Sequence, residues 1–586
     1  MRKDRVIYFI LIMKFIFLDC SAQIKNDTSE VCKLIEKYRS ILTDEIKKNN
    51  IVGLSIAVVD NDSIIWSEGF GSYDTIKNMK VSAETPFLIG SLTKLFTGIA
   101  VMQLQEKGLI NIDSSFVKYV PEFKMKSIYG SINDITIRSM MTHHAGIPAI
   151  DANKFSKEPE HFTKLLDYIN NDYATNPVNT IFRYSNSGVS LLGNLIENVS
   201  HDDYFEHIDE FILNPTGMKN SGFFTSTNQP PSCLLGYNEN KQQFNELPII
   251  DMPAGSLFSS ATDMGKFMKA FISSGKTGNS KILTITSQKE MTKVQNHDVF
   301  YDLGFTMGLI GMVYYSKVGK TFSHESANLY HRGSIYIAPE SGLGIVMLSN
   351  SATANKIFYY SEIILSELAN IKGIKPNKPE FEIIRNPIHK EHNFIYENDD
   401  NLETLTLSEK DFDKYLGTYA ASDLAYKIRM DGKKLVIDYG DYGKKYLLPL
   451  GNNEFVPADA DTSLILNTKE RYYFENYDNN TYLIRVYKNG YQEIWGTKII
   501  NEPINKIWLD RLGTYKVVNV TAYEKEFNLK IDHDLLILSF RPMKIINDNL
   551  AIVYGFGKVS GSALQFIKDE MGKEYLIYRG FKAIKK

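Results

Sequence analysis

The 586-residue sequence contains few cysteines and few tryptophans, three of each. Three cysteines cannot form a dense disulfide framework, and none of them belongs to a CxxC pair. No HExxH motif occurs either, so we expect neither a metal nor a cofactor. Neither sign of charge is in clear excess, because the sequence has 66 Lys and Arg residues and 69 Asp and Glu residues. A net charge of -3 argues against nucleic acid as a partner.

The N-terminus has the composition of an export signal. Basic residues within the first five positions precede a short apolar run over 6–18, and small residues follow. The run is too short for a convincing membrane span. The pattern therefore predicts a signal peptide over residues 1–22 and an exported protein, periplasmic or secreted. A lipid anchor at Cys20 is the alternative.

Residues 30–371 have the pattern of one α+β domain. A hairpin pattern comes first, the middle is mainly helical, strands return over 331–350, and a last helix covers 356–369. This order predicts an antiparallel sheet assembled from both ends of the segment and flanked by helices.

The remainder of the chain has a different organisation. Residues 372–404 are rich in proline and charge, which is typical of a linker. Beyond it the sequence "LGTY" occurs twice, from Leu416 and from Leu512, each time followed by short strand-like runs. This repeat predicts two small antiparallel β modules with a barrel-like form, over 405–500 and 501–586.

A serine and a lysine stand three residues apart in "IGSLTKLFTG", where a helical pattern begins. The pair Ser91 and Lys94 is a weak signal alone, since serine often starts helices and lysine often covers them. Residues i and i+3 share a helix face, so Lys94 can accept or relay the proton of Ser91. A serine hydroxyl needs such a base to become a good nucleophile.

Further motifs follow in a fixed order. They are "MMTHHAGIP" from 140, Tyr184-Ser185-Asn186, "NPTGM" from 214 and "PAGSLFSSATDMGKF" from 253. Together with Ser91-x-x-Lys94, they resemble the serine β-lactamase and penicillin-binding protein superfamily over about residues 35–370. The resemblance is closest to its class C-like branch of esterases, D-aminopeptidases and DD-peptidases. It implies a β-lactamase/transpeptidase-like domain.

The resemblance also implies roles for individual residues. Ser91 would be the acylated nucleophile, Lys94 its activator, Tyr184 the general base and then acid, and Asn186 a group that orients Lys94 and the substrate. The residues themselves leave the base open: the Lys94 cation could lower the tyrosine pKa, or burial could make Lys94 the base. His143, with its neighbour His144, is expected to stabilise a loop.

The third motif of the family departs from the usual pattern. "KTG" at 276–278 lies in a loop-like context, so we place the motif at His324-Glu325-Ser326, before a strand turn. His324 would line the site, and the N–H of Ala327 would be the second oxyanion donor. Ser326 stands where the family has glycine, and its side chain either points away or narrows the groove. We therefore expect poor β-lactam turnover.

The sequence thus predicts an exported serine hydrolase that acts through an acyl-enzyme. Its partner would be a small-molecule or peptide substrate: an ester, a D-peptide or amide, or a β-lactam. D-aminopeptidases of this branch also carry β-barrel modules, which favours a peptidase or amidase. The alternative is a penicillin-binding or sensor-like protein with little turnover.

Overall fold

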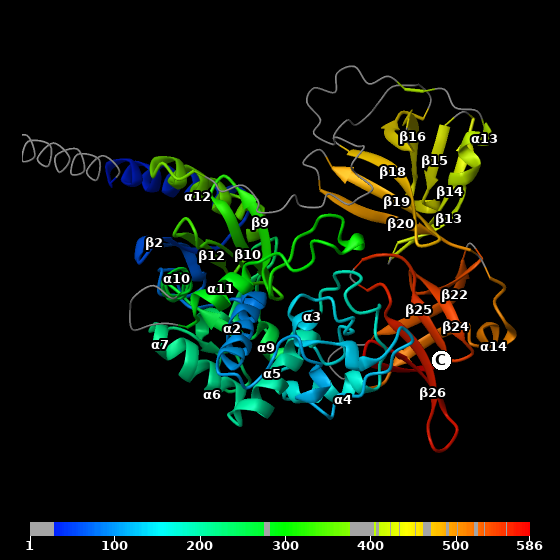
Figure 1. The fold of residues 1–586 in the computed structure, drawn as a ribbon, viewed down its shortest axis with the longest axis horizontal. Coiled ribbons are helices and arrows are strands. Elements are labelled where there is room, and N and C mark those ends of the chain that lie inside the picture. The colour runs from blue at the N-terminus through cyan, green and yellow to red at the C-terminus, as the bar shows by residue number, and fades with distance from the viewer. Residues whose placement is uncertain are drawn as a thin grey trace, which may run out of the picture.

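A computed structural model describes residues 28–274, 282–375, 404–405 and 409–586, apart from short gaps at 422, 433, 452, 461–469, 488–490, 501, 521–524, 533 and 558. The predicted signal peptide, Cys20, the rejected "KTG" and most of the predicted linker lie outside these residues. Figure 1 shows a domain of helices and sheet followed by two barrels. In the described part of the chain, no helix has the length and apolar character needed to span a membrane.

A seven-stranded antiparallel sheet forms the centre of the first domain, in the order β3-β2-β1-β12-β11-β10-β9. Its strands are β1 Gly53–Asp60, β2 Ser63–Asp74, β3 Met79–Lys80, β9 Met312–Ser316, β10 Gly319–Ala327, β11 Arg332–Ala338 and β12 Leu343–Ser349. The first hairpin joins the last strands through β1 and β12, which pair from Leu54 opposite Ser349 to Asp60 opposite Leu343. The predicted α+β class, with a sheet built from both ends of the domain, is confirmed.

Helices cover both faces of this sheet (Figure 1). On one face, a helix over 28–48 and α12 (Tyr360–Ile371) enclose a core with β1 and β12. On the other face lies a larger core with α2, α5 and α10. The other α-helices of this domain are α2 Thr93–Glu106, α3 Ile137–Met141, α4 Leu165–Asn170, α5 Asn186–Ser200, α6 Tyr204–Ile208, α7 Asn214–Thr216, α8 Pro231–Leu234, α9 Met252–Gly255, α10 Ala261–Ile272 and α11 Ile285–Met291. Its short strands are β4 Phe87–Leu88, β5 Gly222–Phe223, β6 Leu235–Tyr237, β7 Gln243–Asn245 and β8 Leu257–Ser259.

Two closed eight-stranded antiparallel barrels follow. Barrel 1 consists of β13 Gly417–Ala420, β14 Ala425–Asp431, β15 Lys434–Asp438, β16 Lys444–Gly451, β17 Glu454–Ala458, β18 Glu470–Tyr477, β19 Asn480–Tyr487 and β20 Gln492–Lys498. Barrel 2 consists of β21 Gly513–Val517, β22 Glu526–Asp532, β23 Leu535–Leu538, β24 Arg541–Asn547, β25 Leu550–Val553, β26 Ala563–Lys568, β27 Glu574–Tyr578 and β28 Phe581–Lys585. Short helices α13 (Glu409–Phe412) and α14 (Lys506–Asp510) precede them. The prediction of two barrel-like modules is confirmed.

The two "LGTY" copies make the same contacts in the two barrels. Tyr419 donates its hydroxyl to the carbonyl of Tyr415 at 2.9 Å, and Tyr515 donates to Arg511 O at 2.6 Å, four residues back in each case. A lysine from the last strand of each barrel then bonds a carbonyl of the preceding turn, Lys498 in barrel 1 and Lys585 in barrel 2. Repeated long-range contacts of this kind support an internal duplication.

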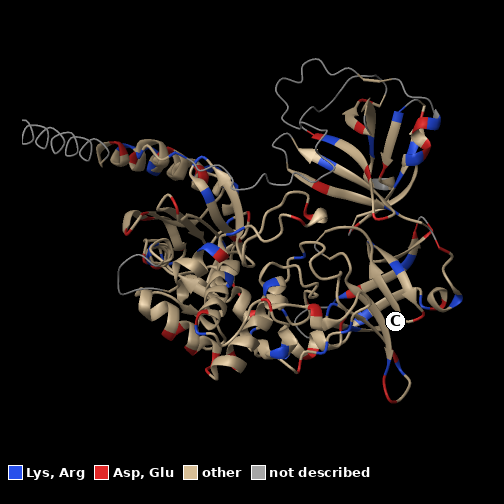
Figure 2. Ribbon diagram, in the orientation of Figure 1, with Lys and Arg blue, Asp and Glu red and all other residues tan. Residues whose placement is uncertain are grey.

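Barrel 2 packs against the first domain through polar bonds and shared core side chains. The carbonyl of Arg579 accepts from the N–H groups of Asp151 and Ala152, at 3.1 and 3.3 Å. The Nε–H of the same residue donates to Ala149 O at 3.1 Å. Ala152 itself belongs to the hydrophobic core of barrel 2. Charged residues of both signs are interspersed over all three parts (Figure 2), and one ion pair at this contact joins Arg579 Nη2 to Asp151 Oδ2 at 3.2 Å.

One glycine of barrel 2 makes the closest approach at this contact. Gly561 has φ +77°, and a Cβ built on it would lie 1.9 Å from Thr175 O. Gly561→Ala should therefore destabilise the full chain by about 3 kcal/mol or more, combining left-handed strain with overpacking. Gly572→Ala is the matched control, because its φ is +80° and its Cβ would meet no atom within 4 Å. Equal unfolding midpoints for the two variants in urea would show that barrel 2 does not pack here.

Candidate active site

Ser91 lies in a short 3-10 turn, Gly90–Leu92, that leads directly into α2. Gly90 has φ +49°, and a Cβ on it would meet Asn328 Oδ1 at 2.6 Å and Ser326 Cβ at 3.2 Å. Thr93 Oγ1 donates to Gly90 O at 2.6 Å and accepts from Leu257 N–H at 3.1 Å. The turn is thus held close against β10 and β8, with Ser91 half-buried at its centre.

The structure brings Ser91, Lys94 and Tyr184 together. Tyr184 donates its hydroxyl to Ser91 Oγ at 2.8 Å, and Lys94 Nζ donates to the same atom at 3.0 Å. Lys94 Nζ also lies 4.9 Å from the centre of the Tyr184 ring. The lysine and tyrosine side chains are thus within proton-transfer distance of one serine oxygen.

Other residues hold the lysine and the tyrosine in place. Lys94 is fully buried and donates to Ala254 O at 2.7 Å, a carbonyl of α9. The His143 ring packs on the Tyr184 ring with centroids 4.5 Å apart, and its Nδ1 accepts from Ser185 N–H at 3.2 Å. Burial lowers the pKa of His143 well below its usual value, so the ring is neutral. His143 is a positioning residue, which agrees with its expected role in a loop.

The protonation state of Tyr184 follows from its burial. Removal from water raises the pKa of its phenol above the usual range, and the hydrogen bond with Ser91 opposes this only in part. The phenol form is therefore the resting form at neutral pH, and Tyr184 is a proton donor to the serine oxygen.

His324 lies near Tyr184 on β10, with ring centroids 6.2 Å apart. Burial, together with the nearby Lys94 cation, lowers the pKa of His324 to about 3. Its Nδ1 lies 2.6 Å from Glu325 O, and a neutral imidazole can make that bond only by donating. Nε2 is then left as an acceptor, so His324 brings no positive charge to the site.

The remaining predicted site residues are Asn186, Ser326 and Ala327. Asn186 is the first residue of α5, and its Oδ1 is buried without a hydrogen-bond partner among the described residues. Ser326 Oγ is also buried and unpartnered, between Gly90 and Gly333. Its side chain thus lies against the Ser91 turn, on the same face of the sheet as His324. Ala327 ends β10 and is exposed.

A pocket of about 520 Å³ opens beside Tyr184 and His324. Most of its lining is apolar, and Gly557 of barrel 2 contributes backbone. Glu325 also borders the pocket, but its carboxylate accepts from the Tyr336 hydroxyl at 3.3 Å, on the face of β10 opposite His324. Sequence reasoning assigned no role to Ala254, Glu325 or Gly557. Ala254 and Glu325 stand in segments that were visible as motifs, whereas Gly557 carried no signal because only tertiary packing brings it to Tyr184.

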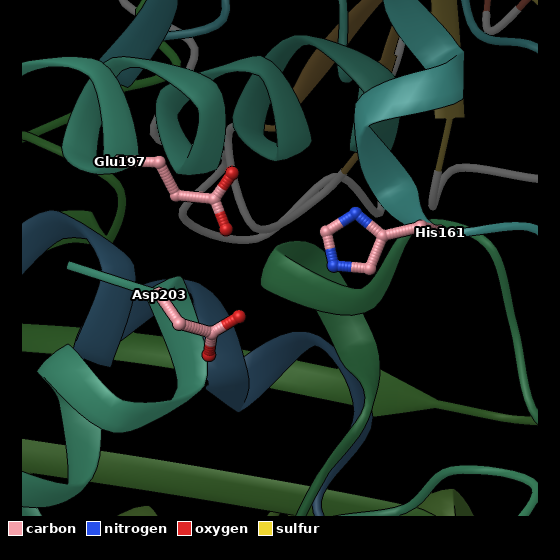
Figure 3. A group of neighbouring side chains, drawn as sticks. All are labelled: His161, Glu197 and Asp203. Atoms are coloured by element: carbon pink, nitrogen blue, oxygen red, sulfur yellow. The ribbon is translucent and has the colours of Figure 1, made fainter. Parts of the chain in front are cut away.

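One group of described residues could hold a divalent cation. It consists of His161, Glu197 and Asp203, whose possible ligand atoms lie within 4.8 Å of one another (Figure 3). Hydrogen bonds already account for the positions of the two carboxylates: Glu197 accepts from Tyr204 N–H at 3.2 Å, and Asp203 caps α6. His161 Nδ1 lies 3.0 Å from Thr163 Oγ1. The group is separate from the Ser91 centre and enters no step of its chemistry.

The fold and this serine centre together define a β-lactamase/transpeptidase-like domain. The family model described as Beta-lactamase matches residues 38–362, more than half of the sequence, so the chain belongs to the Beta-lactamase family. Members of this family are usually serine hydrolases, although some lack activity.

Curated relatives match at modest identity. Protein flp of Staphylococcus aureus strain MRSA252 is 26% identical over 327 residues, which cover 54% of this chain and 62% of that protein. Beta-lactamase-like protein 2 of Dictyostelium discoideum is 25% identical over 339 residues, covering 52% and 59%. The chain thus spans less than two thirds of the length of these relatives.

Two solved structures share the fold. SurE, solved with D-Leu, has a TM-score of 0.56 at 18% identity, covering 81% of this chain and 99% of that one. An octameric penicillin-binding protein homologue from Pyrococcus abyssi has a TM-score of 0.50 at 22% identity, covering 77% and 98%. At these identities the likeness is one of fold alone.

Proposed function

We propose that the chain is a serine hydrolase that forms an acyl-enzyme at Ser91 and releases it to water. The observation that carries this proposal is the pair of hydrogen bonds that Tyr184 and Lys94 make to Ser91 Oγ, at 2.8 and 3.0 Å. A serine oxygen held between two proton carriers in a buried setting has the arrangement of an activated nucleophile.

The proton path follows from these bonds. Lys94 acts from the fraction of chains in which its ammonium has lost a proton to water; the free amine then takes the proton of Ser91 while Oγ attacks the substrate carbonyl carbon. The Tyr184 hydroxyl then protonates the leaving atom as its bond to the carbonyl carbon breaks, and Lys94 returns a proton to the phenolate. In deacylation, water attacks the acyl-enzyme, the same proton transfers run in reverse order, and the carboxylic acid product is released. General acid–base transfer of this kind contributes about 100-fold to 10,000-fold to a rate.

Stabilisation of the oxyanion is assigned to two backbone N–H groups, those of Ser91 and Ala327. The close approach of Gly90 to Ser326 supports this assignment, because it holds the Ser91 turn against the end of β10. Backbone donors fixed in this way need no reorganisation when negative charge develops on the carbonyl oxygen.

We further propose that the preferred substrates lack a carboxylate next to the scissile bond. The lining of the pocket beside Tyr184 is mainly apolar, and its arginine, Arg183, is bonded to barrel 2. His324 is neutral and offers an acceptor nitrogen. A penicillin or cephalosporin carboxylate would thus have to leave water for a mainly apolar pocket, so neutral esters and amides are favoured.

Matched substrates test this preference on the unmodified protein. The value of kcat/KM for an anionic cephalosporin should lie at least about tenfold below that for its neutral methyl ester, because only the anion must move a carboxylate from water into the pocket. Efficient cephalosporin hydrolysis by the unmodified protein would contradict the proposal.

Pre-steady-state kinetics tests the function itself. With p-nitrophenyl acetate, the proposal expects a rapid burst of one p-nitrophenol per chain, followed by continued turnover. A burst without turnover would favour the sensor-like alternative, in which the acyl-enzyme persists. Absence of both would exclude an acyl-enzyme on this ester.

A further inference from the structure

The pocket beside Tyr184 has a second pocket of about 300 Å³ as its neighbour. Both pockets are lined by Ile181, Phe182, Phe305 and Gly557. The first adds Met307 and Met312, and the second adds Tyr301, Phe556 and residues 491–494 of barrel 1. Three parts of the chain therefore line a space made of two neighbouring, mainly apolar pockets, the first of which borders the proton donor.

Contacts between the three parts hold this space open and in place. Arg183, the residue before the proton donor, donates to Gly557 O and, at 2.9 Å, to Ser560 Oγ of barrel 2. The Tyr301 ring lies 5.3 Å from the Phe556 ring and 5.8 Å from the Tyr482 ring of barrel 1. The segment between β25 and β26 is thus anchored on both sides, and its Phe556 forms a fixed apolar wall.

The charged groups around this space are already engaged. Asp302 bonds His144 Nε2 at 2.8 Å, and Glu493 accepts from the Tyr487 hydroxyl. Arg183 is bonded to barrel 2. Glu325 accepts from the Tyr336 hydroxyl at 3.3 Å. The lining therefore offers apolar surface and aromatic rings, which suits an uncharged hydrocarbon chain.

The position of Tyr184 decides whether the acyl group or the leaving group of the substrate enters the two pockets. Its hydroxyl must reach the leaving atom to protonate it, and the acyl carbonyl oxygen faces the N–H groups of Ser91 and Ala327. We propose that the two pockets bind the apolar leaving group of the substrate, an alcohol or amine whose chain runs past Phe182 and Phe305 towards Phe556. This inference rests on the proposed serine hydrolase function and adds the class of leaving group to it.

Acetate esters of straight-chain alcohols test the inference, using ethyl, butyl, hexyl and octyl acetate with the full chain. The alcohols are almost equally good leaving groups, and all four esters give the same acetyl-enzyme. The expected result is a rise in kcat/KM of about twofold to fourfold per methylene until the pockets are filled. Ethyl esters of longer acids are the mirror series and should show no such rise.

Phe556→Ala should flatten this dependence. We expect kcat/KM for octyl acetate to fall about tenfold, and that for ethyl acetate to change by less than about twofold. Phe540→Ala is the matched control, because this exposed phenylalanine of barrel 2 lines neither pocket. Inhibition of the unmodified protein by free alcohols gives a measurement independent of folding: 1-octanol should compete with substrate more strongly than 1-butanol.

Several results would overturn the inference. These are a chain-length effect confined to the acid series, equal inhibition by the two alcohols, and a loss in Phe556→Ala that is the same for all four acetates. Hydrolysis without any chain-length effect would show that the two pockets do not bind the leaving group, and it would leave the hydrolase proposal intact. Absence of any acetylation of Ser91 by the four esters would instead remove the hydrolase proposal, and with it the inference.

Discussion

Replacing Ser91 by alanine should lower kcat/KM for a neutral ester by at least about 1000-fold, while the thermal unfolding midpoint stays within a few degrees. The reason is that the serine oxygen is needed as the attacking atom and contributes little to packing, since the residue is half-buried at a turn. The measurement is the rate of p-nitrophenyl acetate hydrolysis, together with labelling by a fluorophosphonate probe.

A second serine supplies the control for this change. Ser190 is buried on α5, and its Oγ has no hydrogen-bond partner in the described structure. Ser190→Ala should keep the activity within about twofold, because it removes a buried hydroxyl that makes no bond. If Ser91→Ala retained labelling and turnover, the nucleophile would lie elsewhere and the account of the site would fail.

Tyr184→Phe and Lys94→Met should each lower the acylation rate by about 100-fold to 10,000-fold. The two losses should not multiply in the double variant, since Lys94 resupplies the proton that Tyr184 gives to the leaving atom and the two residues act as a unit. Tyr184→Phe keeps the ring that packs on His143, so its loss isolates the hydroxyl. Lys94→Met keeps the apolar stem of a fully buried side chain.

Single-turnover kinetics on all four proteins measures this coupling. The expected double variant is no slower than the slower single variant by more than a few-fold. Near-normal acylation in either single variant would remove that residue from the mechanism. Fully multiplicative losses would show that the two groups contribute independently to one transition state.

The fold could be predicted from local patterns because its elements have clear periods and turns. The apolar runs around Asp60 gave the first hairpin, and the second "LGTY" copy at Leu512 marked a repeated module. The three residues at the centre of the site, Ser91, Lys94 and Tyr184, could be chosen because two of them are neighbours on one helix turn and the third belongs to an ordered set of motifs.

The remaining features depend on contacts between distant segments. The side chain of Ser326 could point either way until the approach of Gly90 was known. Phe556 and Gly557 are more than 350 residues from Tyr184, and their segment contains no motif. Export, with a lipid anchor at Cys20 as the alternative, stays a prediction that amino-terminal sequencing of the exported protein would test.

The most direct test of the account is the mass of the intact full chain, quenched within milliseconds of mixing with p-nitrophenyl acetate and then digested. The account predicts that one acetyl group is added per chain, that it lies on the peptide containing Ser91, and that it disappears as turnover ends. Hydrolysis of the ester with no acetyl group on that peptide, or with the group on another residue, would contradict it.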